Sequence, residues 1–387
     1  MEDSIGILKE LIKIRSDNPG NYEEDIALFI SDILHKNKIN HKIVYSANRR
    51  ANIVGYLEGK KENTLILCGH LDTKPADENW TYNPFTPTVV GNKLYGLGAA
   101  DMKGGIAALL SALIQNKEKC LQNTVSFIFV ADEEMNSDFG IKYLAKHGYI
   151  KGNFAIVAEP TSLKLATRSL GNLWLRVIIK GKKSHAGMYW RGINAIDVSI
   201  YLLHHMKKFI KKCRYLKEKD PELMRFPNLN IGTIKGGSHP GSVADICEFT
   251  IDVRFKEKNE KIFFNKRLRE LISKVAKQFK CSFSVDYFGG GGLPPWSINE
   301  FRKEDINNYL QIIEKSYAKV LNKPIRKITF LGGSDAGILT QLLKIPSVII
   351  GPGSLEQAHS PDEWVYIDEV INASSIYSEI IRRWCYG

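Results

Sequence analysis

Short apolar runs of strand length alternate with helical patterns over residues 1–171. The strand-length runs lie at residues 52–56, 64–68, 125–131 and 154–158. The helical patterns lie at residues 103–115 and 139–146. Strands that alternate with helices fold as a largely parallel sheet covered by helices. We therefore predict an α/β domain, and the strand-like run at residues 347–350 indicates that the chain returns to it.

A different pattern fills residues 172–288. Half-exposed strands are predicted at 173–180 and 248–255, and helices at 194–212 and 270–279. This order is typical of a small α+β unit with helices on one face of its sheet. Gly289–Gly292, followed by two prolines, is the clearest linker signal. We predict a discontinuous domain of residues 1–171 and 289–387, interrupted by an inserted domain of residues 172–288.

Composition narrows the class of protein. The longest apolar runs are far shorter than the ~20 residues of a membrane span, and the N-terminus is acidic rather than signal-like. The six cysteines form no C-x-x-C pair, which predicts reduced thiols and a cytoplasmic protein. The net charge of +12 is concentrated at residues 207–219. That segment lacks interleaved aromatic residues, so a solvated helix face is favoured over a nucleic-acid groove.

Histidine and carboxylate side chains follow the predicted strands where the strands end. Ligands of open α/β sheets bind beyond the carboxyl ends of the strands, and carboxylates gathered there repel one another unless a cation holds them. Two imidazoles and three carboxylates without thiolate suit Zn²⁺, Mn²⁺ or Co²⁺. Five ligands are too many for one catalytic zinc and fit two metals that share a carboxylate. The side chains at the strand ends are His70, Asp72, Glu133, Glu134, Glu159 and His359, and Asp101 lies at the start of the helical pattern at 103–115. The five ligands would be the two histidines and three of these carboxylates.

Spacing indicates roles for some of these residues. Asp72 lies two residues after His70, so in an extended segment its side chain can reach the imidazole and orient it. Glu133 and Glu134 point apart if extended, so one can bind metal while the other acts as general base toward a water held between two metals. Taken singly, each pattern is also typical of a surface ion pair or a helix cap. Their recurrence at successive strand ends favours a site.

These motifs resemble the dinuclear-zinc amidohydrolases and peptidases. That family includes acetylornithine deacetylase, succinyl-diaminopimelate desuccinylase, aminoacylase and the glutamate carboxypeptidases. The matching segments are Gly-His-Leu-Asp-Thr at 69–73, Leu-Tyr-Gly-Leu-Gly-Ala-Ala-Asp-Met-Lys-Gly-Gly at 94–105, Ala-Asp-Glu-Glu at 131–134, Ala-Glu-Pro-Thr at 158–161, Ser-His-Ala-Gly at 184–187 and the segment 351–364 with His359.

The resemblance implies a ligand set. His70 and Glu159 would bind one Zn²⁺, Glu134 and His359 would bind the other, and Asp101 would bridge the two ions. Cobalt or manganese could replace zinc.

The resemblance also implies roles for other residues. Glu133 would be the general base, and the inserted domain would act as a lid and mediate homodimerisation. His185 would stabilise the oxyanion in the partner's site. Arg254 would bind a substrate carboxylate, and Gly333 and Ser334 would lie in the loop beside the substrate.

The expected reaction is hydrolysis of the amide bond of an N-acyl amino acid, and the segment 351–364 looks most like acetylornithine deacetylase. The alternatives are a succinyl-diaminopimelate desuccinylase, a carboxypeptidase or dipeptidase, and a binder without catalysis. The sequence has Leu97 where many relatives have Arg. It also lacks the Arg that closely follows the substrate-loop Asp335 in the desuccinylases, which weakens that alternative. We expect a small-molecule or short-peptide substrate and no nucleic-acid or membrane partner.

Overall fold

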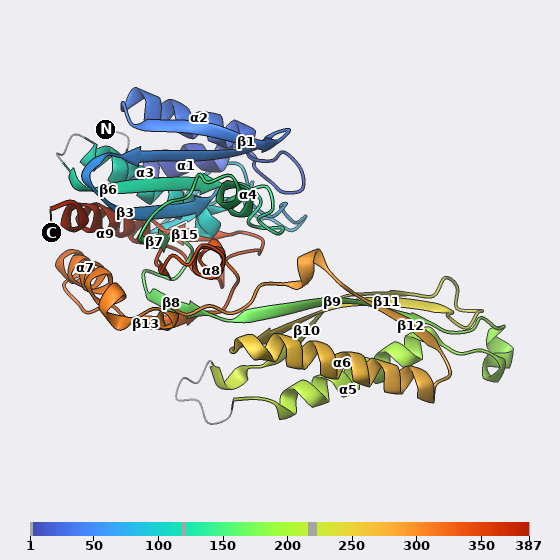
Figure 1. Ribbon diagram of the computed structural model, residues 1–387. Helices are drawn as coiled ribbons and strands as arrows, with labels where there is room; N and C mark the ends of the chain where they lie inside the picture. The colour runs from blue at the N-terminus through green and yellow to red at the C-terminus, as the bar shows by residue number, and fades with distance from the viewer. Residues whose placement is uncertain (1–2, 118–120, 216–222, 387) are drawn as a thin grey trace. The chain divides into compact units, whose positions relative to one another are not determined.

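The computed structural model describes residues 3–117, 121–215 and 223–386 (Figure 1). They form two compact units: residues 1–168 with 297–387, and residues 169–296. Gly289–Gly292 therefore lies inside the second unit. It belongs there because Asn172 exchanges hydrogen bonds with Leu293: their main chains bond at 2.9 Å, and the Asn172 side chain accepts from the Leu293 amide at 2.6 Å.

The first unit is built on an eight-stranded sheet in the order β1-β2-β6-β3-β7-β14-β8-β13. Its centre is parallel and consists of β6 (Leu121–Val130), β3 (Gly59–His70), β7 (Phe154–Val157) and β14 (Ser347–Ile349). The flanking strands are β1 (Asn40–Ala47), β2 (Arg50–Leu57), β8 (Leu165–Ser169) and β13 (Lys327–Phe330). The predicted α/β class with a mostly parallel sheet is confirmed. The antiparallel pairing of β1, β2 and β8 at the margins was not predicted.

Helices bury both faces of this sheet. Leu65 and Leu67 of β3 join one large core, while Ile66 and Cys68 point to the other face and are also buried. Strands buried on both faces read as continuous apolar runs, which is why the sequence revealed them. The core helices are α1 (Ser4–Lys13), α2 (Glu24–Lys36), α3 (Gly104–Asn116), α7 (Lys303–Leu321) and α9 (Ile367–Tyr386). The helices α4 (Ile141–Lys146) and α8 (Asp335–Gln341) contact each other, and α8 packs on β7 and β14.

A three-stranded sheet completes the first unit. It is formed by β4 (Thr88–Val90), β5 (Lys93–Tyr95) and β15 (Trp364–Tyr366). The loop that carries Gly333 and Ser334 ends where α8 begins at Asp335. Ser334 occupies the N-cap position of this helix in extended backbone, and its side chain makes no capping hydrogen bond.

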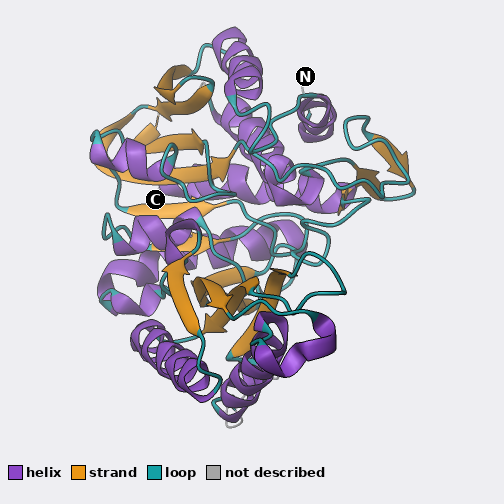
Figure 2. Cartoon of the chain, turned by 90° about the vertical axis from the view of Figure 1, so that its right-hand side faces the viewer, coloured by secondary structure: helices purple, strands orange, loops and turns teal. Residues whose placement is uncertain are grey.

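The second unit has a four-stranded antiparallel sheet in the order β10-β11-β9-β12, with two helices packed on one face (Figures 1 and 2). The strands are β9 (Gly171–Lys180), β10 (Asn228–Gly236), β11 (Ile246–Phe255) and β12 (Ser282–Tyr287), and the helices are α5 (Ala195–Lys212) and α6 (Lys258–Gln278).

Two features of this unit differ from the prediction. α6 begins well before residue 270, because Glu257 and Glu260 form a reciprocal capping box at its start. β10 was not predicted, because most of its side chains are exposed and the apolar alternation of Leu229 and Ile231 breaks at Gly232, where the register shifts.

Three predictions made from composition concern membrane spans, cysteines and the basic segment, and the structure bears on each of them. No helix among the described residues has the length and apolar character needed to cross a membrane. Five of the six cysteines are described, and all five are free thiols; Cys120 lies outside the described residues. In the basic segment, Lys207, Lys208, Lys211 and Lys212 are exposed on α5, and residues 216–219 lie outside the described residues.

An ion-pair cluster around Glu379 joins α7 to α9 and should stabilise the fold at neutral pH. Arg382 and Lys319 hydrogen-bond the Glu379 carboxylate at 2.7 and 3.0 Å, and they lower the pKa of Glu379 to about 2. Arg383 lies 2.8 Å from the same carboxylate. Because the folded pKa lies below the unfolded value near 4.5, this stabilisation is complete above pH 4.5 and disappears as the pH falls toward 2. We expect Glu379→Gln to lower the free energy of unfolding by about 1–2 kcal/mol at pH 7, since the surrounding cations are partly exposed.

Denaturant unfolding at pH 7 and at pH 3 measures this effect, and the difference from wild type should shrink at the lower pH. The matched control is Glu270→Gln, which removes a pair with Arg267 in which both side chains are about half exposed. An equal loss for Glu379→Gln at both pH values would contradict the prediction.

Candidate metal centre

Three neighbouring parallel strands bring the first residues of the site together. His70 ends β3, Glu133 and Glu134 follow β6, and Glu159 follows β7. In the β3–β7 register Cys68 pairs with Val157, so His70 and Glu159 each lie two residues further along adjacent strands. The His70 Nε2 atom is accordingly 3.9 Å from a Glu159 carboxylate oxygen. The strand ends therefore meet at one edge of the sheet, as parallel topology requires.

Asp101 reaches this edge from a kinked turn that precedes α3. The turn opens at Gly98, whose φ of 77° favours glycine. Glu363 holds it by accepting from the backbone amides of Gly98, Ala100 and Asp101 at 2.8, 2.9 and 2.9 Å. Burial raises the pKa of Glu363 to about 8. No role was predicted for Glu363, although it lies in the segment 351–364 that carries the resemblance.

The Asp101 carboxylate lies between the two imidazoles. One oxygen is 3.0 Å from His70 Nε2, and the other is 3.4 Å from His359 Nε2. The His359 Nε2 atom is also 2.9 Å from a Glu134 oxygen. His359 lies in the loop after β14 and its side chain is 49% exposed, whereas Asp101 and Glu134 are buried.

Candidate ligand atoms form two groups, and within each group they lie within 4.8 Å of one another. One group is His70, Glu133 and Glu159. The other is Asp101, Glu134 and His359. The structure thus brings together all five ligands proposed from the sequence, with Glu133 beside the first group.

Burial and mutual repulsion dominate the electrostatics of the cluster. Burial, reinforced by Asp101, raises the pKa of Glu159, and burial also raises the pKa of Glu133 despite the opposing effect of His70. For His70, burial opposes protonation, but the hydrogen bond to Asp101 and the charge of Glu159 raise its pKa overall. Crowded, buried carboxylates of this kind are stabilised by bound cations. The oxygen and imidazole donor set therefore fits a pair of divalent metal ions.

Asp72 makes different contacts from those expected. His70 Nδ1 bonds to the main-chain oxygen of Asp72 at 2.9 Å, while the nearest Asp72 carboxylate oxygen is 3.7 Å away. The carboxylate instead accepts from the backbone amides of Glu133 and Glu134 at 3.1 and 3.2 Å. Asp72 thus orients His70 mainly through its backbone and holds the Glu133–Glu134 segment through its side chain.

A cavity of about 390 Å³ opens beside the second ligand group. Asp101, Glu134 and His359 line one part of it, and Trp80 and Leu97 provide apolar surface. Leu97, the departure from many relatives noted in the sequence, thus replaces a cationic side chain with an apolar one in this wall.

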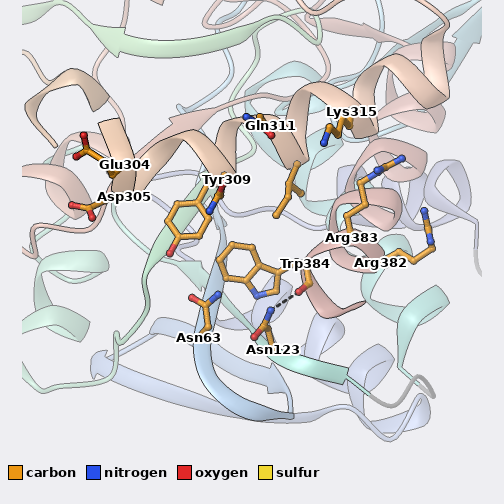
Figure 3. Close-up of a pocket in the computed structure, with 12 residues that line it drawn as sticks. Asn63, Asn123, Glu304, Asp305, Tyr309, Gln311, Lys315, Arg382, Arg383 and Trp384 are labelled. Carbon is orange, nitrogen blue, oxygen red and sulfur yellow. Dashed lines mark hydrogen bonds between the residues drawn. The ribbon is translucent and has the colours of Figure 1, made fainter. Parts of the chain in front are cut away.

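A larger hollow of about 730 Å³ lies elsewhere in the first unit (Figure 3). Tyr309 and Trp384 line it with their ring centres 5.1 Å apart, and Asn123 donates to the Trp384 main-chain oxygen at 2.6 Å. Its described lining includes Arg382 and Arg383, both engaged in ion pairs, and no member of the metal-ligand cluster.

The loop that carries Gly333 and Ser334 leads directly into Asp335. Ser137 donates to Asp335 at 3.0 Å, and burial raises the Asp335 pKa to about 7. Its charge also acts on Glu133, which indicates that this loop lies near the cluster.

His185 and Arg254 belong to the second unit. The His185 Nδ1 atom accepts from the Gly187 amide at 3.1 Å, so the neutral ring carries its proton on Nε2. The Arg254 Nε atom donates to Asp252 at 2.7 Å. Their roles toward the metal cluster stay predictions.

Comparison with known proteins decides the family. The sequence model of peptidase family M20/M25/M40 matches residues 66–383. The chain belongs to this family. It is thus an M20-family metallohydrolase, and the resemblance drawn from the motifs is confirmed.

The relatives of this M20 chain include both deacylases and peptidases. It is 30% identical to the acetylornithine deacetylase of Photorhabdus laumondii over 84% of its own length and 81% of that protein. Its fold is similar to that of a Staphylococcus aureus tripeptidase (TM-score 0.81, 22% identity, 100% and 99% of the two chains). It is also similar to a dinuclear metal-binding M20 peptidase of Bacillus subtilis (TM-score 0.70, 16% identity, 99% and 97%). Family membership and the two ligand groups together indicate a site for two metal ions.

Proposed function

We propose that this M20 metallohydrolase removes the acyl group from an N-acyl amino acid, as an acetylornithine deacetylase-like enzyme with two Zn²⁺ ions. The observation that carries the proposal is the position of Asp101, whose two oxygens face His70 and His359 separately. His70 and Glu159 would hold one ion, Glu134 and His359 the other, and Asp101 would bridge them. Similarity to acetylornithine deacetylase at 30% identity supports the deacylase over the peptidase.

Glu133 performs the proton transfers in the proposed reaction. Bound metal ions would polarise the scissile carbonyl and acidify water. Glu133 takes a proton from the attacking water and delivers it to the leaving amine. Its position supports this role, because a Glu133 carboxylate oxygen lies within 4.8 Å of the ligand atoms of His70 and Glu159. Asp72 holds the Glu133 backbone amide at 3.1 Å and thereby limits where the carboxylate can lie.

The remaining roles concern the substrate. His185 would stabilise the oxyanion in the site of a partner subunit, and its proton on Nε2 suits a hydrogen-bond donor. Arg254 would bind the substrate carboxylate, and the backbone at Gly333 and Ser334 would lie beside it. The second unit would serve as the lid and as the interface of a homodimer.

A substrate panel tests the proposal. Purified protein is incubated with N-acetyl amino acids including N-acetylornithine, N-succinyl-diaminopimelate and unblocked dipeptides, with Zn²⁺, Co²⁺ and Mn²⁺ added in turn. We expect metal-dependent release of free amino acid from N-acetyl substrates at a kcat/KM at least tenfold above that for dipeptides. Faster cleavage of dipeptides would favour a dipeptidase, and no turnover of any substrate would favour a binder.

A further inference from the structure

The segment that carries Glu133 and Glu134 is held by buried contacts outside the metal cluster. The segment begins at Asp132, whose φ of 67° is uncommon for a residue other than glycine. The Asp132 carboxylate accepts from the Phe139 amide at 3.1 Å, and its main-chain oxygen accepts from the Ser137 amide at 2.6 Å. The direction in which Glu133 leaves the strand therefore depends on how Asp132 is held.

Asn18 links Asp132 to Asp72, the carboxylate that accepts hydrogen bonds from the backbone amides of Glu133 and Glu134. The side-chain amide of Asn18 donates to Asp72 at 2.9 Å and to Asp132 at 3.1 Å. Its own backbone amide bonds to the Thr73 main-chain oxygen at 2.9 Å, which fixes Asn18 relative to the strand that ends at His70. Asn18 is 2% exposed, so water cannot readily replace these bonds.

Arg50 supplies the positive charge of this network. Its Nη2 atom donates to Asp132 at 2.8 Å, and Nε and Nη2 bond to Glu23 at 2.8 and 2.9 Å. The rings of Tyr22 and Phe139 lie 4.7 and 5.0 Å from its guanidinium carbon. The Arg50 side chain is 8% exposed, and Glu23 and Asp132 are 0% and 5% exposed. Without Arg50, two buried carboxylates would face each other uncompensated.

We propose that Arg50 and Asn18 are positioning residues for the Glu133–Glu134 pair, acting through Asp132 and Asp72. For Glu133, the inference rests on the proposed function, which makes this residue the general base. For Glu134, it rests only on the grouping of its carboxylate with Asp101 and His359. A shift of about 1 Å at a catalytic group costs on the order of 100-fold in rate. The network that fixes Asp132 should therefore affect both the rate and the affinity for the second metal ion, which is the one that Glu134 and His359 would hold.

Arg50→Gln is the principal test, with Arg50→Lys as the conservative variant. We expect Arg50→Gln to weaken binding of the second Zn²⁺ at least tenfold in competition with a chelator. In the fully metal-loaded, folded enzyme, kcat should fall about 10- to 100-fold with KM changed less than threefold. Arg50→Lys keeps the positive charge but lacks the forked guanidinium group, so it should recover part of the metal affinity and part of the kcat. The control is Arg302→Gln, which removes an exposed fork to Asp305 at 2.9 Å and should change neither quantity.

The result would differ if the network of Arg50 and Asn18 only stabilised the fold. Arg50→Gln would then lower the melting temperature, while metal affinity and the kcat of the folded enzyme stayed at wild-type values, which would overturn the proposal. If Arg50→Gln does not fold, Asn18→Ser leaves the ion pairs intact and should show the same changes with smaller magnitude; unchanged values in a folded Asn18→Ser would likewise overturn it. The metal titration needs no substrate, so it is decided even if the substrate panel rejects the proposed function.

Discussion

Glu133→Ala is expected to retain both metals and lose about 1,000-fold or more in kcat. The side chain is not among the five proposed ligands, but it lies within 4.8 Å of the ligand atoms of His70 and Glu159. General acid–base catalysis by a positioned side chain contributes about 10²–10⁴-fold, and Glu133 would transfer the proton twice in each cycle. Steady-state kinetics on the best panel substrate, together with elemental analysis of the same preparation, measures both effects.

Two variants separate the base role from a general disturbance of the site. Glu133→Gln keeps the shape of the side chain but cannot accept the proton, so it should be nearly as inactive as Glu133→Ala. Glu10→Gln, which removes an exposed glutamate paired with Lys13, should behave like wild type. A Glu133→Ala enzyme with near wild-type kcat would eliminate Glu133 as the base.

Asp101→Ala is expected to lose both metals, whereas His359→Ala should lose only one. Asp101 faces both imidazoles, at 3.0 and 3.4 Å, and its removal takes a ligand from each ion. His359 belongs to the second group, so its removal leaves His70 and Glu159 for the other ion. Elemental analysis after dialysis against metal-free buffer should give about zero metals per chain for Asp101→Ala and about one for His359→Ala.

The control for these losses is an acidic residue outside the cluster. Asp138→Ala removes an exposed carboxylate, paired with Lys142, from the loop that follows Glu134. It should retain both metals. Two metals in Asp101→Ala would show that Asp101 does not bridge, and full occupancy in His359→Ala would remove His359 from the ligand set.

The success and failure of the sequence predictions have a common physical origin. The strands at 64–68, 125–131 and 154–158 were recognisable because both faces are largely buried and every position except Thr64 and Ser126 is apolar. The strands β1 and β10 were missed because β1 buries only one side chain and β10 buries none, so tertiary pairing rather than local pattern selects them.

Glu363 was missed, and the main side-chain contacts of Asp72 were not predicted, for a related reason. Glu363 and Asp72 act mainly by accepting hydrogen bonds from backbone amides, and every residue except proline has such an amide. Residue type and spacing therefore carry no signal for these partnerships. Arg50 likewise reads as one basic residue beside Arg49 until the fold buries it between Glu23 and Asp132.

The sequence by itself determined the fold class, the family and the set of imidazole and carboxylate side chains at the strand ends, because burial of a parallel sheet and metal chemistry both constrain residue type. Only the tertiary structure decided that Asp101 lies between the two histidines, that Asp72 holds the Glu133–Glu134 backbone and that Arg50 is the buried cation behind it. Those relations join segments far apart in the chain, and packing and hydrogen-bond geometry select them from many partners of equivalent chemistry.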